Sequence, residues 1–176
     1  MNTTTPQPTG VHSIEKTPWR IDPTRSSVEF RTPTFWGRKI VKGHFARYDG
    51  SLDLRQRPAI ELTIDARSLN TNNRMRDKHL RSADFFGVES NPQVRFVADS
   101  ATLAGDQLTV HGQLYAAGKS MPLDLEASLT RAGDDLQVDA HAYADHRQLG
   151  MTHSPFGMIP TPSELTVHGR LVRDSD

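Results

Sequence analysis

The segment that decides the fold is residues 69–86, which read LNTNNRMRDKHLRSADFF. Before it, residues 59–66 alternate apolar and polar side chains as a half-buried strand does, and after it residues 94–98 form another short strand candidate. Within the segment, Met75, Leu80 and Ala83 are spaced to share one helical face. The sequence therefore predicts a short helical insert near residues 71–84, which closes one end of whatever the strands enclose.

The rest of the chain consists of alternating segments separated by turns. Asp49–Gly50 is a strong local signal for a hairpin, which would join the strand at 40–45 to the strand at 51–54. Strict alternation over so many strands gives a sheet with one apolar face, and closure buries that face and removes the exposed edges. We predict an all-β fold, an antiparallel up-and-down β-barrel of about eight strands, with a two-sheet sandwich as the alternative. The further strands are expected at 26–30, 108–114, 121–129, 136–144 and 165–171.

Length and composition limit the class of protein. A chain of 176 residues favours a single domain, which we place at 18–174, after a Thr- and Pro-rich arm at 1–17 that we expect to be disordered. Lys+Arg and Asp+Glu both number 21, and this balance argues against a nucleic-acid-binding protein. The absence of cysteine excludes disulfides, thiol catalysis and cysteine-ligated zinc.

The hydropathy pattern bears on location. No apolar run approaches the roughly 18–20 residues of a membrane span. The first ten residues, MNTTTPQPTG, have neither the basic start nor the apolar segment of a secretory signal. We therefore expect a cytoplasmic protein without stable membrane insertion.

Several positions in and around the helical insert resemble the signature of the YceI-like family. They are Thr71, Asn73, Arg76–Asp77, His79–Leu80, Ser82, Asp84–Phe85–Phe86, Pro92 and Phe96. Further similarity, including Ser-x-Val-x-Phe at 26–30 and Gly43-x-Phe45, extends the resemblance to about residues 19–172. The resemblance implies a lipocalin-like barrel that holds long isoprenoid or other lipid chains. Many members are exported and relatives pair, so the resemblance leaves export and a homodimer open.

The predicted inward side chains are mostly small or medium in size. An eight-stranded barrel is just wide enough for side chains or one slim ligand, and small residues on several strands favour a tunnel over a solid core. Gly112 and Gly169 on that face indicate either barrel bending or the close approach of a ligand. Together with the family resemblance, this leads us to expect ligand contacts from Phe30, Phe35, Trp36, Phe45, Leu80, Phe85, Phe86, Phe96, Val110, Leu123, Ala140, Met151, Phe156 and Met158.

The loop at 145–160 is a second notable segment. It resembles the family's acid, basic residue and aromatic–Gly–Met, except that Leu149 stands where the aromatic is usual. Met151, Phe156 and Met158 look exposed and suggest a flexible apolar lip, although methionine also fills gaps in cores.

Four cationic or titratable residues of the insert are candidates for binding a ligand head group. Arg74, Arg76, His79 and Arg81 at a barrel mouth would bind a phosphate or quinone by charge-assisted hydrogen bonds. A structural role is the alternative, in which Asp77 pairs with Arg76 to fix the insert.

Catalytic and metal-binding arrangements are not evident. The eight histidines include no helical i, i+4 pair of the metalloprotease type, and a grouping of Ser154, His146 and Asp145 lacks a nucleophile elbow. We therefore expect no metal and no cofactor, and a non-enzymatic protein that binds, stores or transports an isoprenoid lipid, isoprenoid quinone or fatty-acid-like molecule. The alternatives are a barrel enzyme using His79, Asp77 or His146, and a stress-response interaction module with a solid core.

Overall fold

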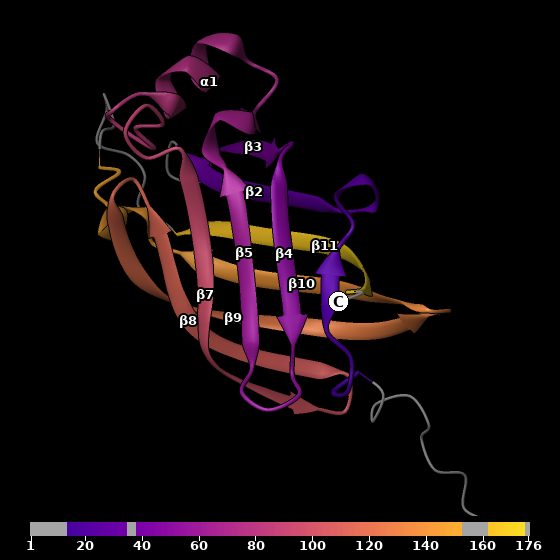
Figure 1. The fold of residues 1–176 in the computed structure, drawn as a ribbon. Helices are drawn as coiled ribbons and strands as arrows, with labels where there is room; N and C mark the ends of the chain where they lie inside the picture. Colours follow the sequence, from indigo (N-terminus) through magenta and orange to yellow (C-terminus); the bar gives the residue numbers. More distant parts are fainter. Residues whose placement is uncertain (1–13, 35–37, 153–161, 175–176) are drawn as a thin grey trace, which may run out of the picture.

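The computed structural model describes residues 14–34, 38–152 and 162–174, and these form one closed antiparallel barrel with a single α-helix at one end (Figure 1). The strands are β1 (Trp19–Ile21), β2 (Ser27–Thr34), β3 (Lys39–Phe45), β4 (Tyr48–Asp53), β5 (Ala59–Asp65), β6 (Leu69–Asn70), β7 (Gln93–Ala104), β8 (Gln107–Ala116), β9 (Lys119–Ala132), β10 (Asp135–Ala144) and β11 (Ser163–Arg173). The helices are α1 (Arg74–Arg81) and the 3-10 turns η1 (Pro23–Arg25), η2 (Ala66–Ser68) and η3 (His146–Leu149).

The ring has eight strand positions, because two of them are interrupted. β1 and β2 lie end to end along the same edge of β11, and β4 continues β3 after a bend. The ring then runs β4, β5, β7, β8, β9, β10 and β11, and it closes through pairing of β1 with both β4 and β11. The predicted up-and-down barrel is therefore confirmed, and the sandwich alternative is not adopted.

The hairpin predicted at Asp49–Gly50 is wrong. Both residues lie inside β4, opposite Thr63 and Leu62 of β5. The Asp49 carboxylate receives two hydrogen bonds from Arg20 on β1, at 3.1 and 2.8 Å, so neighbouring strands on both sides hold this dipeptide extended. Tertiary pairing has overridden a local turn preference.

One end of the barrel, where β9 turns into β10, is packed solid. Trp19, Leu129 and Leu136 have at most 2% of their surface exposed, and Trp19 donates its indole N–H to the carbonyl of Ile14 at 3.2 Å. The guanidinium of Arg131 stacks over the Trp19 ring, 5.3 Å from its centroid. Ile14 is itself buried, so the domain includes residues that we assigned to the arm. We call this region the closed end.

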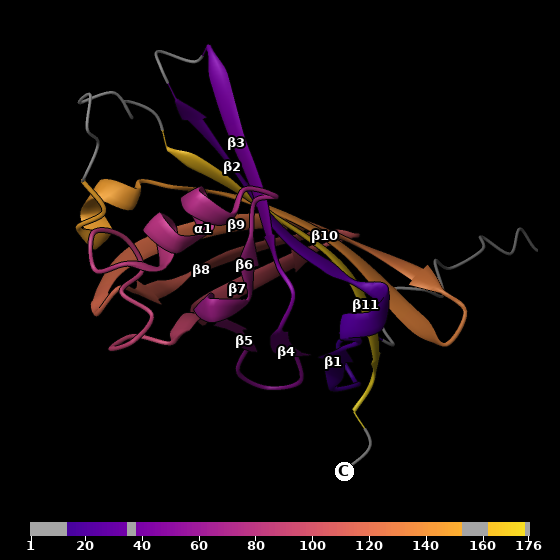
Figure 2. The ribbon, with the colours of Figure 1, turned by 90° about the horizontal axis from the view of Figure 1, so that it is seen from above.

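We call the opposite end the open end. There β5 pairs with β4, whereas β3 pairs with β6. α1 lies across this end, with β2 and β3 on one side of it and β7 and β8 on the other (Figure 2). The predicted helical insert is therefore confirmed, but its predicted apolar face is only partly correct, because Leu80 packs against the core and Met75 does not. Met75 is 85% exposed, whereas Asp77 is buried, because α1 docks partly through polar contacts. Within the described ranges, no helix is long and apolar enough to cross a membrane.

Two glycines on the inner face make room for phenylalanine rings. A Cβ atom at Gly43 would lie 2.4 Å from the Phe30 ring, and one at Gly112 would lie 2.7 Å from the Phe96 ring and 2.3 Å from the carbonyl oxygen of Val97. Gly112 lies opposite Ala98, where β7 contains a bulge. Close packing inside the barrel, rather than a ligand, therefore accounts for the glycine at position 112.

Candidate functional site: an apolar cavity with a polar mouth

The barrel contains a cavity of about 570 Å³ that extends from the open end toward the closed end. Its walls are overwhelmingly apolar, and its volume lies in the usual range for small-molecule sites. A solid core, which the sequence left open, is therefore excluded. The predicted ligand contacts that line it are Phe30, Phe45, Leu80, Phe85, Phe86, Phe96, Val110, Leu123, Ala140 and Met151. The other four, Phe35, Trp36, Phe156 and Met158, lie outside the described residues.

The cavity exists because inward side chains shrink along β10. From the closed end toward the open end they are Leu136, Val138, Ala140, Ala142 and Ala144. Leu136 is fully buried in the closed end, whereas the other four line the cavity. Side-chain volume falls while the backbone pairing stays regular, so the space widens toward α1.

An aromatic cluster connects the insert to the strands of the open end. The ring of Phe45 lies 5.7 Å from that of Phe30 and 6.0 Å from that of Phe86, edge-on to the latter. Phe86 follows α1 and donates its backbone N–H to the carbonyl of Leu80 at 3.0 Å. All four residues line the cavity, so the same side chains form its wall and attach the insert.

A polar network, which we call the latch, fixes the start of α1. The buried Asp77 carboxylate accepts from the backbone N–H of Thr71 at 2.9 Å and from its hydroxyl at 2.5 Å. Arg76 donates to the Thr71 hydroxyl at 2.8 Å and to the Thr71 carbonyl at 2.7 Å. Asn73 caps the helix by accepting from the backbone N–H of Arg76. Asp77 and Arg76 are thus joined through Thr71, so both side chains have a structural role in holding the start of α1.

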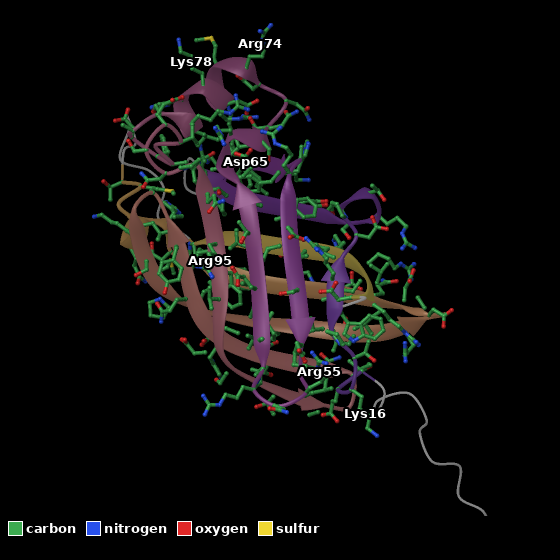
Figure 3. The ribbon with its side chains drawn as sticks, in the orientation of Figure 1. Lys16, Arg55, Asp65, Arg74, Lys78 and Arg95 are labelled. Atoms are coloured by element: carbon green, nitrogen blue, oxygen red, sulfur yellow. The ribbon has the colours of Figure 1, made fainter. Side chains whose placement is uncertain are left out.

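The head-group candidates of the insert are placed very differently from one another. Arg74 points away from the barrel, on the outer side of α1 (Figure 3). Arg81 donates to the carbonyl of Leu69 and does not line the cavity. His79 lines the cavity, lies 3.4 Å from the Asp84 carboxylate and packs edge-on to Phe85. Arg76 also lines the cavity, but two of its nitrogens are already bonded to Thr71.

The turn after β10 supplies further lining residues. The Asp145 carboxylate caps η3 and binds Arg147 at 2.8 Å, and this hydrogen bond lowers the pKa of Asp145. The turn so fixed directs His146, Leu149 and Met151 into the cavity wall. Met151 is buried, so our expectation that it is exposed is wrong.

Three polar side chains at the cavity mouth form a hydrogen-bonded relay, which the sequence analysis did not predict. Thr32 and Ser163 share a hydrogen bond of 2.7 Å, and the Ser163 hydroxyl lies 3.4 Å from Nδ1 of His146. His146 and Ser163 are both only 9% exposed, and burial lowers the pKa of His146. The three residues come from β2, η3 and β11, and no spacing pattern in the sequence connects them.

Two other histidines, His111 and His168, lie on the outer surface. His111 contacts Asp124 at 2.7 Å and His168 contacts Asp139 at 2.7 Å, in both cases through exposed side chains. In the part of the chain that the structure describes, no group of three or more His, Asp or Glu residues is placed to hold a metal ion. Ser154, considered above as a nucleophile, lies outside that part.

The model of the YceI-like domain family matches residues 19–171. The chain belongs to the YceI-like family. Protein YceI of Escherichia coli O157:H7 is 40% identical over 103 residues, and that of Salmonella arizonae is 38% identical over the same length. Each alignment covers 56% of this chain and 54% of the relative, so the chain spans about half the length of these curated relatives.

Solved structures show the same fold. BcnA of Burkholderia cenocepacia aligns with a TM-score of 0.76 at 16% identity, over 85% of this chain and 98% of BcnA. A polyisoprenoid binding domain from Saccharophagus degradans, implicated in plant cell wall breakdown, aligns with a TM-score of 0.70 at 13% identity. That alignment covers 89% of this chain and 98% of the domain.

Proposed function

We propose that this YceI-like protein binds and carries a long apolar molecule, an isoprenoid lipid or isoprenoid quinone, in its barrel. The observation that carries the proposal is the cavity of about 570 Å³ with its overwhelmingly apolar wall. Apolar surface gains roughly 25 cal/mol per Å² on burial, so an alkyl or prenyl chain needs no polar partner along its length. The polyisoprenoid-binding description of the Saccharophagus domain supports this choice of ligand.

The proposal contains no catalytic step. A barrel enzyme that uses His79, Asp77 or His146 remains the alternative, and recovery of a chemically altered ligand after incubation would favour it. Cytoplasmic location and pairing into a homodimer also stay predictions.

Native mass spectrometry of the freshly purified protein tests the proposal, followed by solvent extraction and identification of the bound material. We expect one long-chain lipid for each chain. Ala140→Trp should abolish its uptake, because Ala140 lines the wide part of the cavity, where an indole would block the path of the chain.

The matched control is Gln137→Trp, an exposed position on the same strand, which should retain full uptake. Thermal unfolding of both variants shows whether the barrel is intact. Unchanged lipid uptake by a folded Ala140→Trp variant would contradict the proposal.

A further inference from the structure

Thr32, Ser163 and His146 form a hydrogen-bonded relay of side chains in the largely apolar cavity wall. Nδ1 of His146 faces Ser163, and Ser163 is bonded to Thr32. In the described part of the chain, Nε2 on the other side of the ring has no hydrogen-bond partner, although the side chain is 91% buried and lines the cavity. A polar atom that lines an apolar cavity and has no protein partner is a place where a ligand atom can gain a hydrogen bond.

The cationic groups nearby already have partners. Arg147 is bound to Asp145 at 2.8 Å, through both Nε and Nη2. Arg76 is bound to Thr71, whose hydroxyl in turn binds the Asp77 carboxylate. Burial of an anionic head group between these partners and an apolar wall would carry a large desolvation cost. An uncharged oxygen carries a much smaller desolvation cost, which a single hydrogen bond offsets.

We propose that the mouth of the cavity selects ligands with an uncharged oxygen head, a hydroxyl or carbonyl, which binds Nε2 of His146. This inference rests on the carrier function proposed above and adds the chemistry of the head group. When the Ser163 hydroxyl donates to Nδ1, Nε2 carries the ring hydrogen and donates it to the ligand oxygen. The hydrogen bond between Thr32 and Ser163 is compatible with this tautomer when the Thr32 hydroxyl donates to Ser163. Burial keeps the imidazole neutral at neutral pH.

The test uses three C20 isoprenoid probes that share one tail: geranylgeraniol, its monophosphate, and the hydrocarbon without a head group. Delipidated protein is loaded with the apolar dye diphenylhexatriene, and each probe displaces it at pH 7.5. We expect the alcohol to bind about three- to tenfold more tightly than the hydrocarbon, the range for one neutral hydrogen bond, and the phosphate to bind more weakly than the alcohol.

His146→Phe keeps a ring and removes the hydrogen bond, so it should abolish the difference in affinity between the alcohol and the hydrocarbon. Ser163→Ala should partly reduce the preference for the alcohol over the hydrocarbon, because Nδ1 of His146 loses the hydroxyl that favours one tautomer. His111→Phe, on the outer surface, is the control and should behave as the unmodified protein does. If His146→Phe does not fold, the test is the ¹⁵N chemical shift of His146 Nε2 in the unmodified protein. The alcohol should change this shift on binding, and the hydrocarbon should not.

The outcomes separate the two proposals. Equal affinity for alcohol and hydrocarbon, or tighter binding of the phosphate than of the alcohol, overturns the head-group inference and leaves the carrier function standing. Failure of all three probes to displace the dye overturns both. Loss of hydrocarbon binding in a folded His146→Phe variant would assign His146 to the tail site instead, and would also overturn the inference.

Discussion

The closed end and the open end of this barrel are built from the same strands, yet one is solid and the other hollow. At the closed end, Trp19, Leu129 and Leu136 fill the space between the strands. Toward the open end, alanines on β10 leave the space to the cavity. The alternation of apolar and polar residues is the same in both regions. Side-chain volume, and not strand pattern, therefore decides whether the interior is a core or a binding site.

The two ends also differ in how polar groups are used. The closed end contains the bond from the Trp19 indole to the backbone of Ile14 and the stacking of Arg131 on the same ring. The open end contains the latch around Thr71 and the relay that ends at His146. Polar groups at the closed end support packing, whereas those at the open end hold a covering element and face the cavity.

The largest expected effect is at the closed end. Leu136→Ala should lower the free energy of unfolding by about 2–5 kcal/mol, because the side chain is fully buried and its neighbours are held in the sheet. Denaturant titration measures the loss.

The contrasting change on the same strand is Ala140→Leu. It adds volume where the cavity already has room, so the free energy of unfolding of the delipidated protein should stay within about 1 kcal/mol of the original value or rise. Equal destabilisation by Leu136→Ala and Ala140→Leu would contradict the division into a solid end and a hollow end.

A smaller effect is expected at the latch. Thr71→Val keeps the shape of the side chain but removes the hydroxyl that joins Arg76 to the buried Asp77, at a cost of about 1–3 kcal/mol. Hydrogen exchange should accelerate first at the amide of Asp77 in α1, while amides of the closed end stay protected. Thr130→Val, at an exposed position of β9, is the control and should change neither quantity.

The smallest effect is the pH dependence that arises from His146. Its pKa is lowered from 6.5 by burial, so below that pH the unfolded chain takes up a proton that the folded chain resists. The stabilisation is therefore complete above about pH 6.5 and is lost as the pH falls. The neighbouring Asp145 and Arg147 are paired with each other, and the lowered pKa of Asp145 places its own titration at more acidic pH.

Stability measured from pH 7.5 to 5 should thus fall less steeply in His146→Phe than in the unmodified protein. Identical slopes would show that His146 is not buried as a neutral ring in the folded state.

Much of the barrel could be predicted from the sequence, because each strand is recognisable from the residues within its own segment. Alternation marked the strands, and the series Leu136, Val138, Ala140, Ala142 and Ala144 records the widening of the cavity in a single segment. The Asp49–Gly50 signal failed because Arg20 and the pairing with β5 hold that dipeptide extended. These contacts come from other strands, so the dipeptide alone does not reveal them.

The mouth of the cavity was less predictable for the same reason. Thr32 and Ser163 are 131 positions apart in the chain, yet their hydroxyls lie 2.7 Å apart. Burial of Asp77 and exposure of Met75 likewise reverse the expected polarity of α1, because the helix docks through the latch. A sequence pattern indicates which face of a helix or strand is apolar. It does not indicate that a polar side chain can be buried because a residue elsewhere in the chain forms a hydrogen bond with it.

Of the strands that the structure describes, none pairs with one edge of β3 along part of its length. Among the described residues, β3 from Lys39 to Gly43 is paired only with β2, and β6 joins it only at His44 and Phe45. Where two strands of the ring are paired, parting them breaks backbone hydrogen bonds. We expect this edge of β3 to separate from the rest of the wall at a lower cost in backbone hydrogen bonds than a fully paired strand would.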